Sequence, residues 1–319
     1  MCCEKVVDLR MALLALLSAV IVLLSVGQSE GRHEGVEYWR GKLGMTVAIP
    51  ETLREMAVAG GSVSDYLQHL SKEGNELNRL LDTKLYMVAA DEAADPSIFL
   101  FFLMKDMREG AKMTLHFTSH TPRPSFLSRP LADAIPFSSR QFSQILPTLN
   151  ISHTHPDIAT FMMKTLKKCE LPAVDGETKK CATSLESMVD FATSQLGTCV
   201  NLSVVPTNAP KQSVKQEYTI TAISSFQTQT QFGSSLVACH NLQYPYAVYY
   251  CHRVHKTKAV KITLKAADGT TAHRIAVCHA DTSTWNPKNI AFKMLGVKPG
   301  DASICHFTPN DSIVWLPSN

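Results

Sequence analysis

Alternating apolar and polar positions mark the C-terminal half of the chain. In one such stretch Val260, Ile262 and Leu264 are separated by single polar residues. Successive side chains of a strand point to opposite faces, so this period of two predicts a strand with one buried face. The turn-forming pair Asp268-Gly269 follows this stretch and predicts a hairpin. The predicted strands cover residues 98–103, 113–117, 218–223, 246–251, 258–265, 272–279, 303–307 and 313–316.

Helical patterns lie mainly in the N-terminal half. Pro50 followed by Glu51 is typical of a helix start. Apolar residues recur at helical spacing over 63–81, and further helices are predicted over 157–167 and 183–195. The whole pattern predicts an α+β fold with a short helical N-terminal region and a β-rich C-terminal half.

Local signals indicate where some elements begin and end. Ser184 starts one helix, and Glu186 is in position to complete its N-terminal cap. Asn286, before Pro287, is expected to cap a short helix near the end of the chain. Four prolines between 118 and 137 predict an irregular segment there.

Residues 1–27 have the features of a secretory signal peptide. A weakly basic start precedes an apolar run over 11–26, which is shorter than the roughly 20 residues that a membrane-spanning helix needs. We therefore expect cleavage after Gly27, secretion, and no stable membrane insertion afterwards. A variable N-terminal region would then cover 28–97 and the main domain 98–318.

Cysteines and sequons agree with an extracellular setting. Seven cysteines remain after signal cleavage, and an oxidising compartment would pair most of them. The number is odd, so at least one is free or bonded elsewhere. Asn150, Asn201 and Asn310 each begin an Asn-X-Ser sequon and are candidate glycosylation sites.

Composition narrows the classes of function. Hydrophobic residues make up 45% of the chain and charged residues 18%, which is typical of a globular core. The formal net charge is +3 and no Lys/Arg-rich run is present, so nucleic acid is not expected as a partner. No serine-nucleophile, phosphate-loop or zinc-protease motif occurs, and a hydrolase has no support.

The dipeptide Cys-His occurs four times within 68 residues. Ten residues separate the first two pairs, and 25 residues separate each later pair from the one before it. Neighbouring side chains of a strand diverge, so a cysteine and the histidine after it should lie on opposite faces. The pairs are Cys239-His240, Cys251-His252, Cys278-His279 and Cys305-His306.

This arrangement suggests a division of labour. The four cysteines can form two disulfides, in one of three connectivities, while the imidazoles converge on the other side. Oxidised cysteines cannot bind metal, which leaves nitrogen ligands that suit Cu(II). Zinc fits the same ligands and would be favoured if the cysteines were reduced. The alternative is four disulfide-forming cysteines beside four incidental histidines.

The spacing of these four pairs resembles the signature of the plant BURP-domain family. The segments Phe101-Phe102, Pro136-Phe137-Ser138-Ser139 and Tyr244-Pro245-Tyr246 also resemble elements of that family. The resemblance covers about residues 98–318. It implies a secreted, disulfide-stapled protein of the plant apoplast or cell wall, in a family where copper centres on the motif histidines are known.

The resemblance also assigns roles to residues. It implies copper ligands at His240, His252, His279 and His306, and disulfide-forming cysteines at Cys239, Cys251, Cys278 and Cys305. It further implies a disulfide between Cys169 and Cys181. Cys199 has no counterpart in the family pattern.

Three functions follow from the resemblance. The first is a copper-binding protein acting in plant development or stress, with a cell-wall polysaccharide or a wall enzyme as a possible partner. The second is an autocatalytic, copper-dependent cyclase that crosslinks a Trp or Tyr in its own N-terminal region. The third is a non-catalytic, wall or polygalacturonase-associated protein.

The aromatic residues of the N-terminal region separate the first two functions. Tyr38 and Trp39 are expected to anchor this segment onto the main domain as buried aromatics. The competing hypothesis makes Trp39, Tyr66 or Tyr86 a crosslinking residue. The region is short and unrepeated, which favours the first function.

Overall fold

The structure of the 319-residue chain is a computed structural model. The structure describes residues 34–58, 101–115, 123–151, 156–173, 176–197, 201–206, 215–226, 236–254, 256–308 and 311–318. The signal-peptide segment, the helix predicted over 63–81 and Cys199 lie outside these residues. In the described part of the chain, no helix is both long enough and apolar enough to cross a membrane.

Two antiparallel sheets form the centre of the molecule. The first has six strands in the order β1-β10-β9-β8-β5-β2, and the second has five in the order β3-β7-β6-β11-β4. The strands of the first are β1 (Phe101–Leu103), β2 (Lys112–Leu115), β5 (Gln216–Ser225), β8 (Thr257–Ala266), β9 (Thr271–His279) and β10 (Ile304–Phe307). Those of the second are β3 (Glu177–Ala182), β4 (Asn201–Pro206), β6 (Val237–Leu242), β7 (Val248–Val254) and β11 (Ile313–Ser318).

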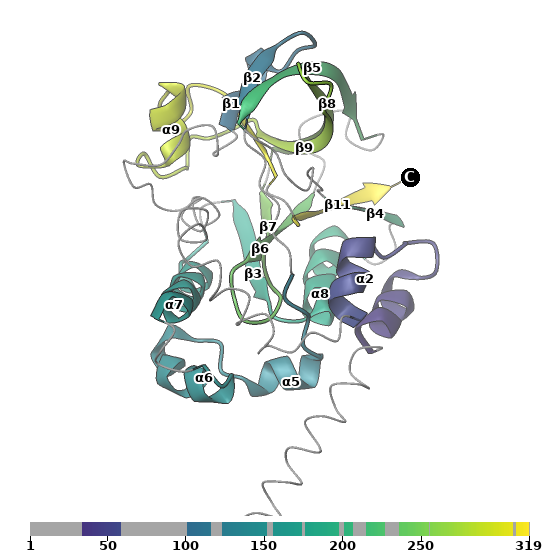
Figure 1. The fold of residues 1–319 in the computed structure, drawn as a ribbon, viewed down its shortest axis with the longest axis vertical. Helices are drawn as coiled ribbons and strands as arrows, with labels where there is room; N and C mark the ends of the chain where they lie inside the picture. The colour runs from purple at the N-terminus through teal and green to yellow at the C-terminus, as the bar shows by residue number, and fades with distance from the viewer. Residues whose placement is uncertain are drawn as a thin grey trace, which may run out of the picture.

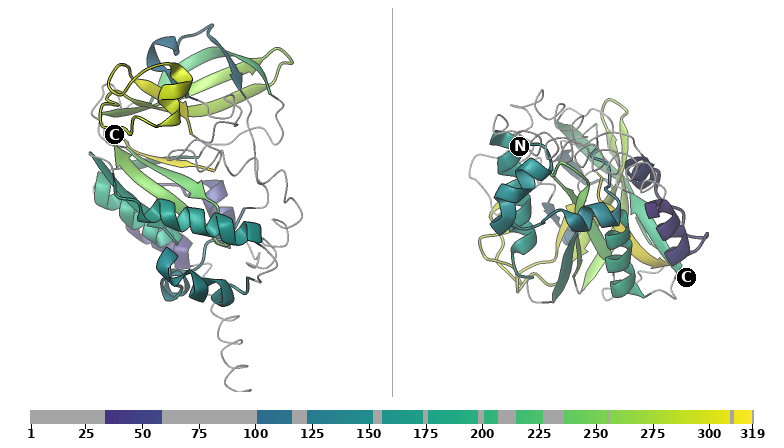
Figure 2. Two further views of the ribbon diagram at one scale, coloured as in Figure 1. Left: turned by 90° about the vertical axis from the view of Figure 1, so that its left-hand side faces the viewer. Right: turned by 90° about the horizontal axis from the view of Figure 1, so that it is seen from below.

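The helices are distributed unevenly between the two sheets. Figure 1 shows the six-stranded sheet and α9 at one end of the molecule, and the five-stranded sheet with the other helices towards the opposite end. Figure 2 shows the same separation from the side. The helices are α2 (Glu51–Val58), α5 (Arg129–Ala134), α6 (Phe142–Thr148), α7 (Pro156–Glu170), α8 (Leu185–Leu196) and α9 (Ile290–Leu295), with a further helix over 34–43.

Each sheet has its own hydrophobic core. In the six-stranded sheet, Val260, Ile262 and Leu264 are buried together, as their alternation predicts. In the five-stranded sheet, α8 packs against the face that carries Trp315. The fold is α+β with a β-rich, disulfide-bonded C-terminal half, as predicted from the sequence.

Several predicted elements are confirmed. The helices predicted at 157–167 and 183–195 correspond to α7 and α8. The hairpin turn between β8 and β9 is closed by Ala266 N–H donating to Thr270 O at 2.9 Å. Gly269 adopts a φ of 88° in this turn, a conformation that glycine accepts without strain.

Other local predictions were wrong in detail. The stretch predicted to be irregular contains α5, because its proline stands in the first turn, where no intrahelical N–H bond is lost. Ser187, rather than Glu186, completes the cap of α8 with Ser184. Asn289 caps α9, because it directly precedes Ile290, whereas Asn286 lies farther from the helix and its side chain accepts from Lys288 N–H.

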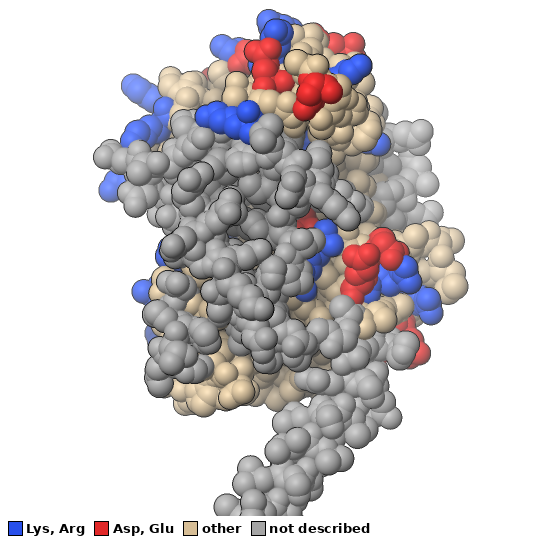
Figure 3. All heavy atoms as spheres, in the orientation of Figure 1, with Lys and Arg blue, Asp and Glu red and all other residues tan. Residues whose placement is uncertain are grey.

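Charged side chains of both signs lie near one another on the surface. The face drawn in Figure 3 has Lys and Arg beside Asp and Glu among its coloured atoms. On α2, Arg54 Nε donates to Glu51 Oε2 at 2.9 Å in an exposed i,i+3 pair. Such exposed pairs add little to stability, typically under about 1 kcal/mol.

Candidate metal centre

Three disulfides join the six cysteines that were expected to pair. They are Cys169–Cys181, Cys239–Cys251 and Cys278–Cys305. The last two connect residues that lie directly opposite each other on neighbouring strands, β6 with β7 and β9 with β10. Each disulfide therefore fixes the register of the two strands that carry one pair of Cys-His motifs.

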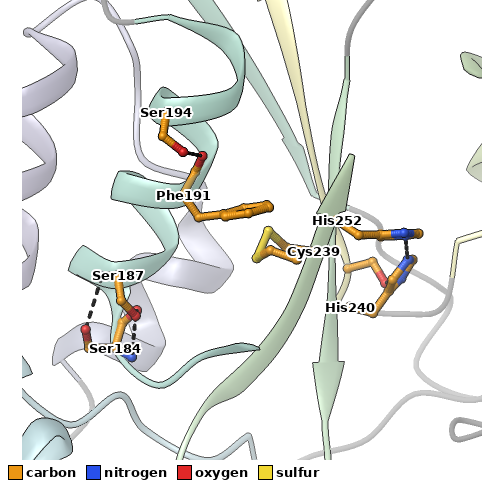
Figure 4. Close-up of a disulfide and its surroundings, with 9 residues drawn as sticks. Ser184, Ser187, Phe191, Ser194, Cys239, His240 and His252 are labelled. Atoms are coloured by element: carbon orange, nitrogen blue, oxygen red, sulfur yellow. Dashed lines mark hydrogen bonds between the residues drawn. A yellow bond between two sulfur atoms is a disulfide. The ribbon is translucent and has the colours of Figure 1, made fainter. Parts of the chain in front are cut away.

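Alternation along the strands separates cysteines from histidines. Cys239 lies in the hydrophobic core with residues of α8, on the side of Phe191. His240 and His252 lie on the opposite face of the same two strands (Figure 4). Cys278 and Cys305 likewise belong to the core of the six-stranded sheet. The cysteines thus face the cores, which leaves the other face of each strand pair for imidazoles.

The β6/β7 pair brings two imidazoles into contact. The Nε2 atoms of His240 and His252 are 3.2 Å apart. His240 Nδ1 lies 3.2 Å from Ser312 Oγ, and His252 Nδ1 lies 2.8 Å from Glu177 Oε1. Both histidines are buried, with 6% and 8% of their surface exposed.

The β9/β10 pair repeats this arrangement in the other sheet. The Nε2 atoms of His279 and His306 are 3.3 Å apart. His279 Nδ1 lies 3.4 Å from Thr257 Oγ1, and His306 Nδ1 lies 3.3 Å from the Phe307 carbonyl oxygen. Phe101 and Trp285 pack against these two rings at centroid distances of 5.7 and 5.0 Å.

The two pairs lie close to each other. The ring centroids of His240 and His306 are 6.5 Å apart, so the histidines of both sheets share one buried region. Among the described residues, no three His, Cys, Asp or Glu side chains come together as a complete metal site. The geometry is that of two half-sites, each with two nitrogen atoms facing one another.

Hydrogen-bond partners fix the protons of the imidazoles. A carboxylate or a carbonyl oxygen can only accept, so His252 and His306 carry their proton on Nδ1. Their Nε2 atoms then accept the Nε2–H of His240 and His279. The hydroxyls of Ser312 and Thr257 complete the two hydrogen-bond series by donating to Nδ1 of the first histidine of each pair. This assignment follows from the network of partners.

Burial favours the neutral form of the histidines. Desolvation is the largest cause that lowers the pKa of His240 and His279 well below the ordinary value. It also lowers the pKa of His306 to about 4. Neutral imidazole is the form that ligates metal, so these side chains are available as ligands at mildly acidic pH.

The residues present fit a copper or zinc ion. Two nitrogen ligands at about 2.0–2.1 Å from a zinc ion, at its tetrahedral angle, are about 3.3 Å apart, whereas the roughly 90° angle of a tetragonal Cu(II) site brings them to about 2.9 Å. The observed spacings of 3.2 and 3.3 Å match the tetrahedral value, and a small approach of the two rings would give the tetragonal one. Each histidine also has a partner on its other ring nitrogen, as metal-binding histidines almost always have.

Comparison with known proteins identifies the family. A model of the BURP domain matches residues 100–317, more than half of the chain. The chain belongs to the BURP domain family. BURP domain-containing protein 5 of Oryza sativa subsp. japonica is 38% identical over 301 residues, which cover 92% of this chain and 91% of that protein.

Two other plant relatives are longer than the matched part. BURP domain-containing protein 3 of the same rice is 45% identical over 237 residues, 73% of this chain and 55% of its own length. BURP domain protein RD22 of Arabidopsis thaliana is 39% identical over 242 residues, 73% of this chain and 60% of its own length. The chain therefore spans little more than half of some relatives and nearly all of another.

Some site residues of this BURP domain were not found from the sequence. Glu177, Ser312 and Thr257, which contact the histidines, lie at least 20 residues from their partners along the chain. Lys168 is a buried lysine near the first pair, and burial lowers its pKa to about 8. A Cys-His spacing pattern contains no signal for such distant neighbours.

The predicted glycosylation sites remain predictions. Asn150 is exposed in a left-handed conformation after α6. Asn201 begins β4, opposite Ser318 of β11. Asn310 lies outside the described residues.

The aromatic residues of the N-terminal region are anchored as expected. Trp39 is 1% exposed, packs on Trp315 at a centroid distance of 5.1 Å, and donates from Nε1 to Val47 O at 2.9 Å. Tyr38 donates to Asp190 of α8. The helix over 34–43 therefore belongs to the core of the five-stranded sheet, on the face that does not carry the histidines.

Proposed function

We propose that this BURP-domain protein is a secreted copper-binding protein of the plant apoplast or cell wall, acting in development or stress. The ligands are His240, His252, His279 and His306. One observation carries the proposal: two buried pairs of imidazoles, one from each sheet, direct their Nε2 atoms at each other.

The donor set favours copper over zinc. The four cysteines of the Cys-His pairs, together with Cys169 and Cys181, are bonded in disulfides, so none of these six can supply a thiolate for a structural zinc site. Imidazole ligands suit Cu(II), which binds most tightly among the divalent first-row metals. Disulfides are also typical of extracellular proteins.

The chain's own residues would hold and shield the ion. Copper supplies one-electron redox chemistry when it is bound. The four imidazoles provide nitrogen ligands from four strands, and the disulfides fix each strand pair beside them. Phe101 and Trp285 flank the second pair and limit the access of water.

Metal analysis tests this proposal. The secreted, glycosylated protein should retain about one or two copper ions per chain and show at most one free thiol. Replacement of the four histidines by Asn should abolish copper retention, whereas His273→Asn should not. His273 is a suitable control because it is an exposed histidine of β9, bonded to Thr263 rather than to the pairs. Copper retained by the four-histidine variant would overturn the site.

Self-crosslinking is the second candidate function, favoured by the complete set of four histidines. The burial of Trp39 behind the five-stranded sheet argues against its modification in the folded protein. Copper-loaded protein incubated in air would be digested and analysed by mass spectrometry. Loss of two hydrogens in a peptide containing Tyr66 or Tyr86 would establish a cyclase, and unmodified peptides would exclude self-cyclisation under those conditions.

Association without metal is the third function that the family suggests. Metal-free protein that folds and binds a wall polysaccharide or a polygalacturonase normally would support a purely structural role. Binding that requires copper would instead connect the partner to the histidine centre.

A further inference from the structure

Glu177 is the carboxylate that contacts the candidate metal centre. It is the first residue of β3, at the edge of the five-stranded sheet, and β3 pairs with β7. Its side chain is 8% exposed. One oxygen, Oε1, accepts from His252 Nδ1 at 2.8 Å and from the Tyr250 hydroxyl at 2.9 Å. The carboxylate is thus buried and held by two donors.

We infer that Glu177 is the positioning residue of the β6/β7 half-site, an inference that rests on the proposed copper function. An ionised carboxylate accepts but cannot donate, so it holds the His252 proton on Nδ1. The lone pair of Nε2 then points to the position between the two imidazoles. Glu177 therefore acts through His252 and need not touch the metal.

The second half-site shows what Glu177 adds. There, His306 Nδ1 faces the carbonyl oxygen of the next residue, Phe307, at the longer distance of 3.3 Å. A neutral carbonyl gives a weaker hydrogen bond than a carboxylate does, and it contributes no negative charge. Only the β6/β7 pair, among the described residues, therefore has an anionic partner for a ligand histidine.

Nearby lysines suggest a competing structural role for Glu177. The Nζ atoms of Lys168 and Lys179 lie 5.0 and 5.3 Å from the centre of the Tyr250 ring. The charge of Glu177 favours the protonated form of Lys168, so the carboxylate also compensates a buried cation. A test must separate charge compensation from control of the His252 tautomer.

The tautomer can be measured without metal. In metal-free protein labelled with ¹⁵N-histidine, NMR should show His252 as the Nδ1–H tautomer. In Glu177→Ala it should shift towards the Nε2–H tautomer. Glu186→Gln is the matched control, because Glu186 is a buried glutamate of α8 on the far side of the sheet. Unchanged Nδ1–H in Glu177→Ala would overturn the inference whether or not the protein binds copper.

Copper binding provides the second measurement. Glu177→Ala should weaken Cu(II) binding about 10- to 100-fold and change the electron paramagnetic resonance spectrum. Glu177→Gln, which retains a neutral acceptor, should lose less, and Glu186→Gln should match the wild type. Lys168→Met/Glu177→Gln removes both charges: binding as weak as in Glu177→Gln supports positioning, and recovery to the wild-type affinity would assign the effect to charge compensation.

These measurements distinguish a failure of the proposed copper function from a failure of the role inferred for Glu177. A wild-type protein that binds no copper contradicts the proposed function, while the tautomer result still decides what Glu177 does. A wild-type protein that binds copper, with a Glu177→Ala variant of equal affinity and spectrum, keeps the proposed function and overturns the inference. Circular dichroism and a thiol count on each variant would verify the fold.

Discussion

The two histidine pairs share one construction but differ in their surroundings. In each, a cross-strand disulfide lies beside two imidazoles that meet through Nε2 atoms. The β6/β7 pair has a carboxylate partner, Glu177, and a buried lysine nearby. The β9/β10 pair has a carbonyl partner and the rings of Phe101 and Trp285. If the pairs bind copper as proposed, the common geometry with different electrostatics would make two half-sites of unequal affinity.

Acidification should have the largest effect, because it acts on both pairs of the metal-free protein. The pKa values of His240, His279 and His306 are lowered in the folded state. Below the ordinary histidine pKa of about 6.5, the unfolded chain therefore binds more protons than the folded protein does. The free energy of unfolding should therefore be steady above about pH 7 and fall from pH 6.5 through about 4.

Denaturant titrations across this pH range would measure the effect. Replacing His279 and His306 by Asn should remove a large part of the slope, because two of the three lowered pKa values belong to that pair. A slope that is unchanged in this variant would contradict the assignment.

Loss of a disulfide should have the next largest effect on the free energy of unfolding. The loop-closure model gives about 3 kcal/mol for Cys239–Cys251, with a separation of 12, and about 3.5 kcal/mol for Cys278–Cys305, with a separation of 27. Double Cys→Ala variants, measured by chemical denaturation, should follow that order. The reverse order would show that native-state packing outweighs the entropy of the unfolded chain.

The order in which the two histidine pairs bind copper should show that their affinities differ. The first equivalent of Cu(II) should prefer the β6/β7 pair, because its carboxylate partner favours a dication. His252→Ala, which removes a ligand, should thus weaken binding of the first equivalent by more than the roughly 10- to 100-fold that loss of an outer-shell partner costs, and His306→Ala should weaken it less. Competition titrations with a chelator would show this, and equal losses in both variants would indicate one shared ion.

The hydroxyl partners should have the smallest effect. Ser312→Ala and Thr257→Val each remove one neutral hydrogen bond to a histidine, worth about 0.5–1.5 kcal/mol. Each change should weaken copper binding by less than about tenfold, as measured by the same competition titration. A loss as large as that caused by Glu177→Ala would contradict this order and mean that the hydroxyl orients its histidine as strongly as Glu177 orients His252.

The sequence could predict features that depend on local period. The separation of Cys239 from His240 follows from the alternation of side chains along a strand, and the structure shows it. The burial of Trp39 could also be expected from the preference of large aromatic side chains for the core. The four histidines could be named as candidate ligands because the spacing of the Cys-His pairs resembles the signature of the BURP-domain family.

Other features depend on contacts between distant segments. Glu177 lies 75 residues before His252, on a strand whose polar sequence carries no apolar alternation. Its role appears only when β3 pairs with β7. The approach of His240 to His306 likewise requires two separate sheets to face each other, which no local pattern predicts.

We propose that the four histidines together form a copper centre. The first measurement is electron paramagnetic resonance of the protein loaded with one equivalent of Cu(II), alongside the variant with all four histidines replaced by Asn. A copper centre on these histidines would show superhyperfine splitting from histidine nitrogen in the wild type and lose it in the variant. The same nitrogen splitting in both proteins would contradict it.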